Sequence, residues 1–293
     1  MKSKNILITG ATGNIGHEVI RFLFENKTPN HVIAGVRNIE KARSEFKIYP
    51  QLDFVQFDFE NFQTFDTALK HIDCIFLLRP PHISDTEKYF KPLISKIKEK
   101  GIDEVIFLSV QGVEKSKIIP HNKIEKLIKE QHISHIFLRP SYFMQNLTTT
   151  LINDIRIKRE IILPAGKAKF NWIDVENIGE VAAIMMDRFS EYRNREIELT
   201  GTENESFYKV VELMNLIGNK TPIKFMDTNA LQFYQIKQKE GMDKGMIFVM
   251  IMLHLLRRFQ KEPVISNFYE LLTNKKPTTL VEFIKREENK LAI

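Results

Sequence analysis

NILITGATGNIG, at residues 5–16, is the most informative stretch of this sequence. A short apolar strand pattern, NILIT, runs into three glycines spaced G-x-x-G-x-x-G, and apolar residues at helical spacing follow them. Glycines let the backbone turn sharply beside a pyrophosphate, and a helix that begins there points free N–H groups and its positive dipole end at the phosphates. We therefore expect a dinucleotide-binding turn; a structural turn without a ligand is the alternative.

The glycine turn also predicts which residues contact the cofactor. Its spacing differs from the commoner G-x-G-x-x-G fingerprint, so the prediction rests on the position of the glycines between a strand and a helix near the N-terminus. The residues expected to contact the dinucleotide are Gly10, Thr12, Gly13, Asn14, Ile15 and Gly16.

Strand and helix patterns alternate through the first part of the chain. Apolar strand patterns occupy residues 31–37, 52–59, 74–80, 103–110 and 134–140. Amphipathic helix patterns between them occupy residues 41–48, 62–72, 87–101 and 121–131. Such alternation is typical of βαβ units. We expect an α/β fold with a doubly wound parallel sheet, forming a Rossmann domain over residues 1–150.

The alternation loosens beyond about Tyr142. A strand pattern, REIELTG, occupies residues 195–201, and helix patterns occupy residues 206–220 and 278–291. We expect residues 151–293 to form a smaller α+β C-terminal lobe for a substrate or a partner. Part of residues 170–190 is expected to return to the first domain.

The most apolar segment, GMIFVMIMLHLL, occupies residues 245–256. Its length is well short of the roughly 20 residues that span a bilayer. We expect a buried helix. A flexible wall of an apolar substrate pocket is one alternative, because Met246, Met250 and Met252 adapt to irregular shapes. A membrane contact is the other.

Bulk composition bears on partners and compartment. The 293 residues are 43% hydrophobic and 27% charged, and the net charge of +6 is spread without a block of like charges, so we expect no nucleic-acid partner. The single cysteine, Cys74, excludes an intramolecular disulfide and lies in a strand pattern, where a packed thiol is expected. The N-terminus has no signal-peptide pattern, so we expect a cytoplasmic protein without a membrane partner. No histidine or cysteine cluster has metal-binding spacing.

Arg37 indicates which nicotinamide cofactor is preferred. It ends the second strand pattern, where NAD-specific sites usually carry an acid that binds the ribose 2′-hydroxyl, and Lys41 and Arg43 follow it. A guanidinium binds a 2′-phosphate, whereas a carboxylate repels it. We expect NADP as cofactor, with NADPH preferred over NADH; a solvated loop arginine is the alternative.

Four more residues stand at strand ends that face the expected cofactor. Asp58 and Phe59 end the third strand pattern, where the acid can accept from the adenine amine and the ring can stack on the base. A structural role is the alternative for both. Leu78 and Arg79 end the 74–80 pattern. Arg79 is expected to meet the pyrophosphate or, alternatively, to pair with a nearby carboxylate.

Several motifs together resemble the NmrA-like family. GATGNIG, VRN, FLSVQG, LRPSYFMQNL and FNWIDVENIGEVAA occur in the order and at the intervals of that family, and the C-terminal LTGTENESFYKVVELMNLIG and PTTLVEFIK resemble it too. The resemblance covers nearly the whole chain. It implies an atypical short-chain dehydrogenase/reductase relative that binds NAD(P) on a Rossmann fold. Some relatives are NAD(P)H-dependent reductases of quinones or unsaturated compounds, and others act as redox sensors or regulators without known turnover.

The Tyr-x-x-x-Lys pair of the wider superfamily is absent. Ser109 and Lys123 match its serine and lysine, but Ile119 stands four residues before Lys123 and has no proton to donate. Lys123 is expected to hold the nicotinamide ribose, against a plain surface lysine. Tyr142 is expected to line the cofactor or substrate pocket. His121 is a candidate proton donor, against an exposed residue at a helix start.

These observations lead to two hypotheses. The first is an NADPH-dependent reductase that transfers hydride to a small apolar acceptor such as a quinone. Hydride transfer to a quinone needs position and orientation above all, and water can supply the proton. The second is a non-catalytic NADP(H) redox sensor that acts through a protein partner. The same glycines serve both hypotheses.

Overall fold

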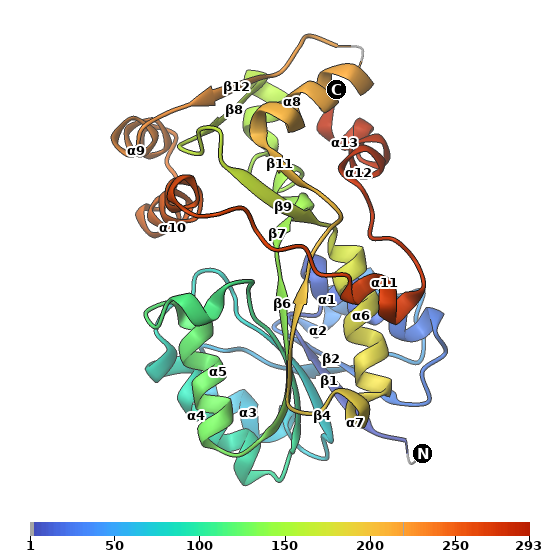
Figure 1. Ribbon diagram of the computed structural model, residues 1–293. Coiled ribbons are helices and arrows are strands. Elements are labelled where there is room, and N and C mark those ends of the chain that lie inside the picture. Colours follow the sequence, from blue (N-terminus) through green and yellow to red (C-terminus); the bar gives the residue numbers. More distant parts are fainter. Residues whose placement is uncertain (1–2, 219) are drawn as a thin grey trace. The chain divides into compact units, whose positions relative to one another are not determined.

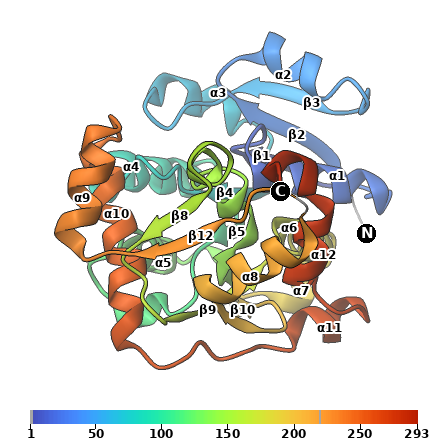
Figure 2. The same cartoon turned by 90° about the horizontal axis from the view of Figure 1, so that it is seen from above.

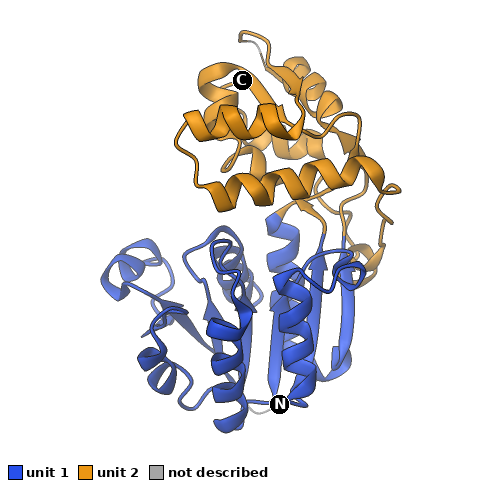
Figure 3. Ribbon diagram, turned by 90° about the vertical axis from the view of Figure 1, so that its left-hand side faces the viewer, with its two compact units in different colours: residues 1–140, 175–199 blue, residues 141–174, 200–293 orange. Residues whose placement is uncertain are grey.

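The computed structural model of the protein describes residues 3–218 and 220–293. Residues 1 and 2 of the N-terminal stretch and residue 219 of the 206–220 helix pattern lie outside the described residues. The chain forms two compact units (Figure 3). Unit 1 combines Met1–Pro140 with Val175–Leu199, and unit 2 combines Ser141–Asp174 with Thr200–Ile293.

Unit 1 is built on a parallel sheet. The sheet has seven strands in the order β10-β6-β5-β4-β1-β2-β3. The strands are β1 (Asn5–Thr9), β2 (His31–Val36), β3 (Asp53–Gln56), β4 (Cys74–Leu78), β5 (Glu104–Leu108), β6 (Ser134–Pro140) and β10 (Arg195–Leu199). Each strand pairs in parallel with its neighbours, and the order reverses between β1 and β4. The doubly wound α/β fold expected from the sequence is confirmed.

Helices cover both faces of this sheet (Figure 1). On one face α1 (Asn14–Glu25) packs along α6 (Val175–Asp187), and on the other α4 (Thr86–Glu99) packs against α3 (Phe65–Ala68) and α5 (Pro120–Glu130). Short elements complete the unit: α2 (Ile39–Glu45), η1 (Phe62–Thr64), η2 (Val113–Lys115) and α7 (Phe189–Tyr192). Strands buried on both faces explain why the sequence shows apolar runs instead of strict alternation. Cys74 is one of these buried residues, as expected for a packed thiol.

Unit 2 contains two small sheets. One has the order β11-β9-β7, and the other pairs β12 with β8 in parallel. Figure 2 shows β8 and β12 side by side, although some sixty residues separate them in the chain. The strands are β7 (Tyr142–Phe143), β8 (Glu160–Leu163), β9 (Lys169–Ile173), β11 (Asn204–Ser206) and β12 (Lys224–Asp227).

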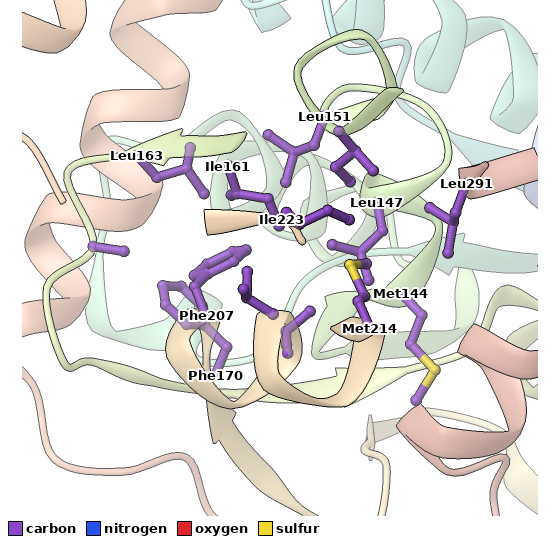
Figure 4. Packing of buried hydrophobic residues seen from close by; sticks show 14 of the residues in the cluster. Met144, Leu147, Leu151, Ile161, Leu163, Phe170, Phe207, Met214, Ile223 and Leu291 are labelled. Carbon is purple, nitrogen blue, oxygen red and sulfur yellow. The ribbon is translucent and has the colours of Figure 1, made fainter. Parts of the chain in front are cut away.

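The helices of unit 2 enclose a hydrophobic core of their own (Figure 4). Phe207 and Trp172 are fully buried in it, and Met144, Leu147 and Met214 pack in the same cluster. The helices are η3 (Met144–Leu147), η4 (Asp154–Lys158), α8 (Phe207–Ile217), α9 (Ala230–Lys239), α10 (Lys244–Leu255), η5 (Leu256–Phe259), α11 (Phe268–Thr273), α12 (Leu280–Arg286) and α13 (Glu288–Leu291).

Helix termini in unit 2 follow the sequence closely. Ser206 accepts from the Lys209 N–H at the start of α8. Thr279 and Glu282 form a capping box at the start of α12, where each side chain accepts from the backbone N–H of the other. These caps satisfy N–H groups that a helix start leaves without partners, and they explain why both helices begin where the sequence predicts.

Two expectations for the second half of the chain are wrong. The REIELTG strand lies in unit 1, where β10 pairs with β6, because the free edge of β6 offers it a parallel partner. The 245–256 segment is a helix, but it is only partly buried. Its buried residues are Ile247, Met250 and His254, whereas Phe248 is 62% exposed. Apolar composition alone cannot tell which sides of such a helix find partners.

Candidate functional site: the glycine turn of unit 1 and a part-buried Tyr–His pair of unit 2

The glycine turn joins β1 to α1, and each glycine has its own structural reason. Gly10 has a φ of +62°, which favours glycine, and a Cβ there would lie 2.8 Å from the Leu78 side chain. A Cβ on Gly16 would lie 2.3 Å from the Gly10 carbonyl oxygen, so only glycine lets α1 pack this closely on the turn. A Cβ on Gly13 would lie 3.2 Å from that same oxygen, a tight contact with backbone. Gly13 is also exposed, so a ligand can approach its backbone.

The first turn of α1 has N–H groups available to a ligand. Gly13 is the N-cap, and within the described residues no side chain caps the helix. The Gly13 N–H donates to the Gly10 carbonyl oxygen at 2.9 Å, which closes the turn. Thr12 and Asn14 are exposed beside it, and Ile15 is half-buried. Uncapped N–H groups and the positive end of the helix dipole together suit an anionic group, and this cradle fits the pyrophosphate of a dinucleotide.

Arg37 follows β2 directly and is exposed. Within residues 3–218 and 220–293 it forms no ion pair or hydrogen bond. Its neighbour Asn38 caps α2 by accepting from the Lys41 N–H at 2.9 Å, which fixes the backbone just beyond the arginine. The Arg43 guanidinium lies over the Phe54 ring, 5.4 Å from its centroid. Arg37 thus keeps all its donors for a ligand, whereas Arg43 has an aromatic partner.

Asp58 and Phe59 are held in different surroundings beyond β3. Asp58 is half-buried, and its carboxylate accepts from the Glu60 N–H at 3.0 Å. Phe59 is only 6% exposed and packs edge-on against Phe57, with the ring centroids 4.9 Å apart. The Phe59 ring is therefore part of the core of unit 1, and its stacking on an adenine stays a prediction.

The structure gives Arg79 partners that the sequence analysis did not foresee. Its guanidinium donates to the carbonyl oxygens of Pro80, Pro81 and Ile83, at 3.0, 3.0 and 2.7 Å. Its Nε also lies 3.5 Å from Nε2 of His121, and burial lowers the arginine's pKa. The alternative that Arg79 pairs with a nearby carboxylate is wrong, because backbone carbonyl oxygens of its own loop accept its hydrogen bonds instead. Contact with a pyrophosphate stays a prediction.

α5 carries the other residues expected near the nicotinamide. Ile119 is the N-cap of α5 and has extended backbone, so it lies outside the helix as the sequence indicates. His121 is half-buried, and burial together with the Arg79 charge lowers its pKa to about 3. Such a histidine is neutral at physiological pH, which makes it a poor proton donor. Lys123 is exposed and, within the described residues, has no ion-pair partner.

Ser109 follows β5 and differs from an open catalytic serine. It is 1% exposed, and its hydroxyl has no hydrogen-bond partner among the described residues. Its backbone N–H donates to the Leu138 carbonyl oxygen at 2.7 Å. The serine position of the wider superfamily is therefore present, but its side chain is enclosed by the protein.

Tyr142 lies in unit 2, where it forms a pair with His254. The Tyr142 hydroxyl is 3.0 Å from Nε2 of His254, and Nδ1 of that histidine is 2.6 Å from the Met250 carbonyl oxygen. A carbonyl oxygen only accepts, so Nδ1 carries the proton and Nε2 is the acceptor. The Tyr142 hydroxyl therefore donates a hydrogen bond to Nε2 of His254.

The surroundings of this pair keep both groups neutral. The rings of Phe170, Trp172 and Phe207 lie around Tyr142, with centroids 4.9 to 6.0 Å away. Burial raises the pKa of Tyr142 and lowers that of His254 to about 4. The pair is thus a hydrogen bond between uncharged groups inside an aromatic cluster.

His254 is the residue of this pair that the sequence analysis missed. A usable signal was present, because it is the one polar side chain in the apolar run GMIFVMIMLHLL. A polar group on an apolar helix needs a hydrogen-bond partner if it is buried, and here it has two. The partner itself could not be identified, because Tyr142 lies 112 residues away in the chain.

Two absences hold for the described part of the chain. Among these residues no group of three or more histidine, cysteine, aspartate or glutamate side chains is placed to hold a metal ion. None of the helices within the same ranges is long and apolar enough to cross a membrane.

Comparison with known proteins identifies the family. A model of the NmrA-like family matches residues 2–284. The chain is 30% identical to prestalk A differentiation protein A of Dictyostelium discoideum over 242 residues, which cover 82% of this chain and 77% of that protein. It is 26% identical to the NAD(P)H azoreductase of Xenophilus azovorans, over 96% of each protein.

A solved structure has the same fold. The NADPH-dependent quinone oxidoreductase of Escherichia coli, in complex with NADPH, superposes with a TM-score of 0.83 at 18% sequence identity, covering 96% of this chain and 99% of that one. Structure and family model lead to the same assignment. The chain has a parallel sheet with a glycine turn at the start of α1, and the family model matches nearly the whole sequence. The chain belongs to the NmrA-like family.

Proposed function

We propose that this protein is a reductase that binds NADPH at the glycine turn of unit 1 and transfers hydride to a small apolar acceptor such as a quinone. The observation that carries the proposal is the turn itself. Gly10 and Gly16 are required by backbone geometry and close packing. Gly13, the middle glycine, is exposed at an uncapped helix start, so a phosphate can approach its backbone closely.

The proposed cofactor contacts are made by groups that have no protein partner within the described residues. The N–H groups at the start of α1, with Thr12 and Asn14 beside them, bind the pyrophosphate. Arg37 binds the 2′-phosphate through its unpaired guanidinium and gives NADPH preference over NADH. Lys123 binds the nicotinamide ribose. Bound NADPH supplies the hydride.

Reduction is favoured over other uses of the cofactor by two considerations. The azoreductase and the quinone oxidoreductase with which the chain shares its family or fold are both named for reduction by NAD(P)H or NADPH. The protein residues supply no acid in the place of the superfamily tyrosine, since Ile119 stands there and His121 is neutral. An acceptor whose reduced form takes its proton from water suits such a site.

The test is oxidation of NADPH in the presence of a panel of quinones, followed by absorbance. We expect turnover above the uncatalysed rate, and its loss in Gly13→Asp, because a carboxylate there meets the pyrophosphate. Asn26→Asp is the matched control. It adds the same charge at the exposed C-cap of the same helix, and turnover should persist.

Direct binding measurements separate the two parts of the proposal. Absence of NADPH binding to the folded wild-type protein would overturn both the cofactor site and the reductase. Tight NADPH binding without turnover over the whole panel would overturn the reduction of quinones and support a redox sensor that acts through a protein partner.

A further inference from the structure

Unit 2 contains a pocket that the proposed function does not use. It has a volume of about 310 Å³ and is formed by two segments, residues 167–169 at the start of β9 and residues 257–262 at and beyond η5. Cationic side chains dominate its lining, and Glu262 is its one carboxylate. The cations are Lys167, Lys169, Arg257 and Arg258.

Within the described residues, two of these four cations form an ion pair with a carboxylate. Lys169 pairs with Glu262 at 3.0 Å. Arg258 pairs at 3.4 Å with Asp227, which also accepts from the Gly166 N–H at 2.8 Å. In each pair the carboxylate neutralises the charge of its cation. The net positive charge of the pocket therefore comes from Lys167 and Arg257.

Arg257 is held in place by uncharged acceptors and forms no ion pair within the described residues, although the Glu262 carboxylate acts on its charge. Its guanidinium donates to the Lys169 carbonyl oxygen at 2.9 Å, to the Gln260 side-chain oxygen at 3.1 Å, and to the Lys261 carbonyl oxygen. All three acceptors are uncharged. Partial burial lowers the pKa of Arg257, which shows the cost of withdrawing this charge from water. An arginine oriented by neutral acceptors retains its charge and spare N–H donors for an anion.

Lys167 supplies the second surplus charge. It is exposed, and within residues 3–218 and 220–293 it has no ion-pair or hydrogen-bond partner. Its flexible chain can follow a ligand that the fixed Arg257 orients. Two unneutralised cations match a dianion, and a phosphate monoester carries close to two negative charges at neutral pH.

We propose that this pocket is a second binding site, which takes the phosphate group of a small phosphate monoester through Arg257 and Lys167. All its lining residues belong to unit 2, so it does not share a residue with the glycine turn of unit 1. The proposal does not depend on NADPH binding or on turnover.

The test uses inorganic phosphate as the probe, observed by phosphorus NMR line broadening at constant ionic strength with chloride as the balancing anion. We expect saturable binding that weakens about tenfold in Arg257→Gln and about threefold in Lys167→Gln. Lys239→Gln, which removes an exposed lysine of α9, should leave binding unchanged. Lys167→Gln keeps the test informative if loss of the Arg257 hydrogen bonds perturbs folding.

Two further arms identify where the phosphate binds and what carries it. Binding should persist in Gly13→Asp, because the pocket is separate from the glycine turn. Loss of binding in Gly13→Asp with no change in Lys167→Gln and Arg257→Gln would overturn the proposal. Retention on phosphatidylcholine vesicles containing phosphatidic acid, without binding of inorganic phosphate, would also overturn it, since a lipid surface would then be the ligand.

Discussion

The polar side chains of the proposed cofactor site in unit 1 lack protein partners, whereas two polar pairs in unit 2 bind each other. In unit 1, Arg37 and Lys123 are exposed and lack ion-pair partners among the described residues. In unit 2, Tyr142 pairs with His254, and the ammonium of Lys237, 2% exposed, pairs with the buried Asp154. A side chain without a protein partner keeps its hydrogen bonds for a ligand, whereas a buried pair holds the fold together. Pairing therefore separates candidate ligand contacts from structural polar groups.

The largest effect should come from breaking the Asp154–Lys237 pair. Asp154→Ala leaves the buried Lys237 ammonium with only Glu240, at 3.0 Å, and should lower the free energy of unfolding by about 3–5 kcal/mol. Urea unfolding followed by the fluorescence of Trp172, the single tryptophan, reports on unit 2. Asp66→Ala is the matched variant in unit 1. It removes an exposed pair with Lys100, which water already screens, so its loss of stability should be much smaller. Equal losses in the two variants would show that burial does not set the cost of losing an ion pair.

The next effect is a pH dependence of unit 2 that originates in His254. Its pKa is lowered from the ordinary 6.5 to about 4 by burial, so the unfolded chain binds more protons than the folded one between these pH values. Stability should therefore be complete above about pH 6.5 and fall by about 3 kcal/mol as the pH drops to about 4. The measurement is the Trp172 transition in urea at several pH values.

His254→Gln should flatten this pH profile, because the titrating group is gone. His121→Gln is the corresponding variant in unit 1, where burial lowers the histidine pKa to about 3. It should leave the Trp172-detected profile unchanged. An unaltered slope in His254→Gln would show that other groups cause the acid sensitivity.

Arg37→Asp should produce a large effect on binding and a negligible one on stability. Replacing a charged phosphate contact by a repelling carboxylate should weaken NADPH binding by about 1.5–3 kcal/mol, roughly ten- to a hundredfold, and NADH binding much less. The free energy of unfolding should change by less than about 0.5 kcal/mol, because Arg37 has no partner in the described residues. Titration with both dinucleotides checks the difference.

Lys47→Asp reverses the charge of another exposed residue in unit 1 and is the control for long-range electrostatics. Equal losses of NADPH and NADH affinity in Arg37→Asp would contradict a role in binding the 2′-phosphate.

The smallest effect should come from Tyr142→Phe. Removing the hydroxyl leaves Nε2 of His254 as a buried acceptor without its donor and should cost about 1–2 kcal/mol of stability. NADPH affinity should not change if Tyr142 is purely structural. A large decrease in turnover of the folded variant would show that Tyr142 also acts on the acceptor. Pairing with a protein residue would then not distinguish structural side chains from those that contact a ligand.

The sequence predicted unit 1 better than unit 2 for a physical reason. Buried parallel strands and amphipathic helices repeat over short distances, so their patterns are visible locally. The glycine turn is equally local, because the backbones of Gly10 and Gly16 lie close together although only five residues separate them in the chain. In unit 2, β8 pairs with β12 and α10 exposes Phe248, and neither feature follows from a short window of sequence.

Candidate site residues divide in the same way. The sequence predicted cofactor contacts at the glycines, Arg37 and Lys123 from their positions relative to strands and helices, and these contacts stay predictions. It could not foresee that Phe59 is enclosed by the core of unit 1 or that Arg79 donates to the carbonyl oxygens of its own loop. Those outcomes depend on how loops pack and on which acceptors they present.

The alternation of strands and helices up to residue 140, the glycine turn, the lack of the Tyr-x-x-x-Lys pair and the family resemblance can all be read from the sequence. The tertiary structure was needed to show that β10 completes the sheet of unit 1, that Tyr142 donates to His254, and that Arg257 lines a cationic pocket. Local patterns encode backbone geometry and burial, because these depend on neighbouring residues. The partner of a polar group depends on residues distant in the chain, and folding alone brings them together.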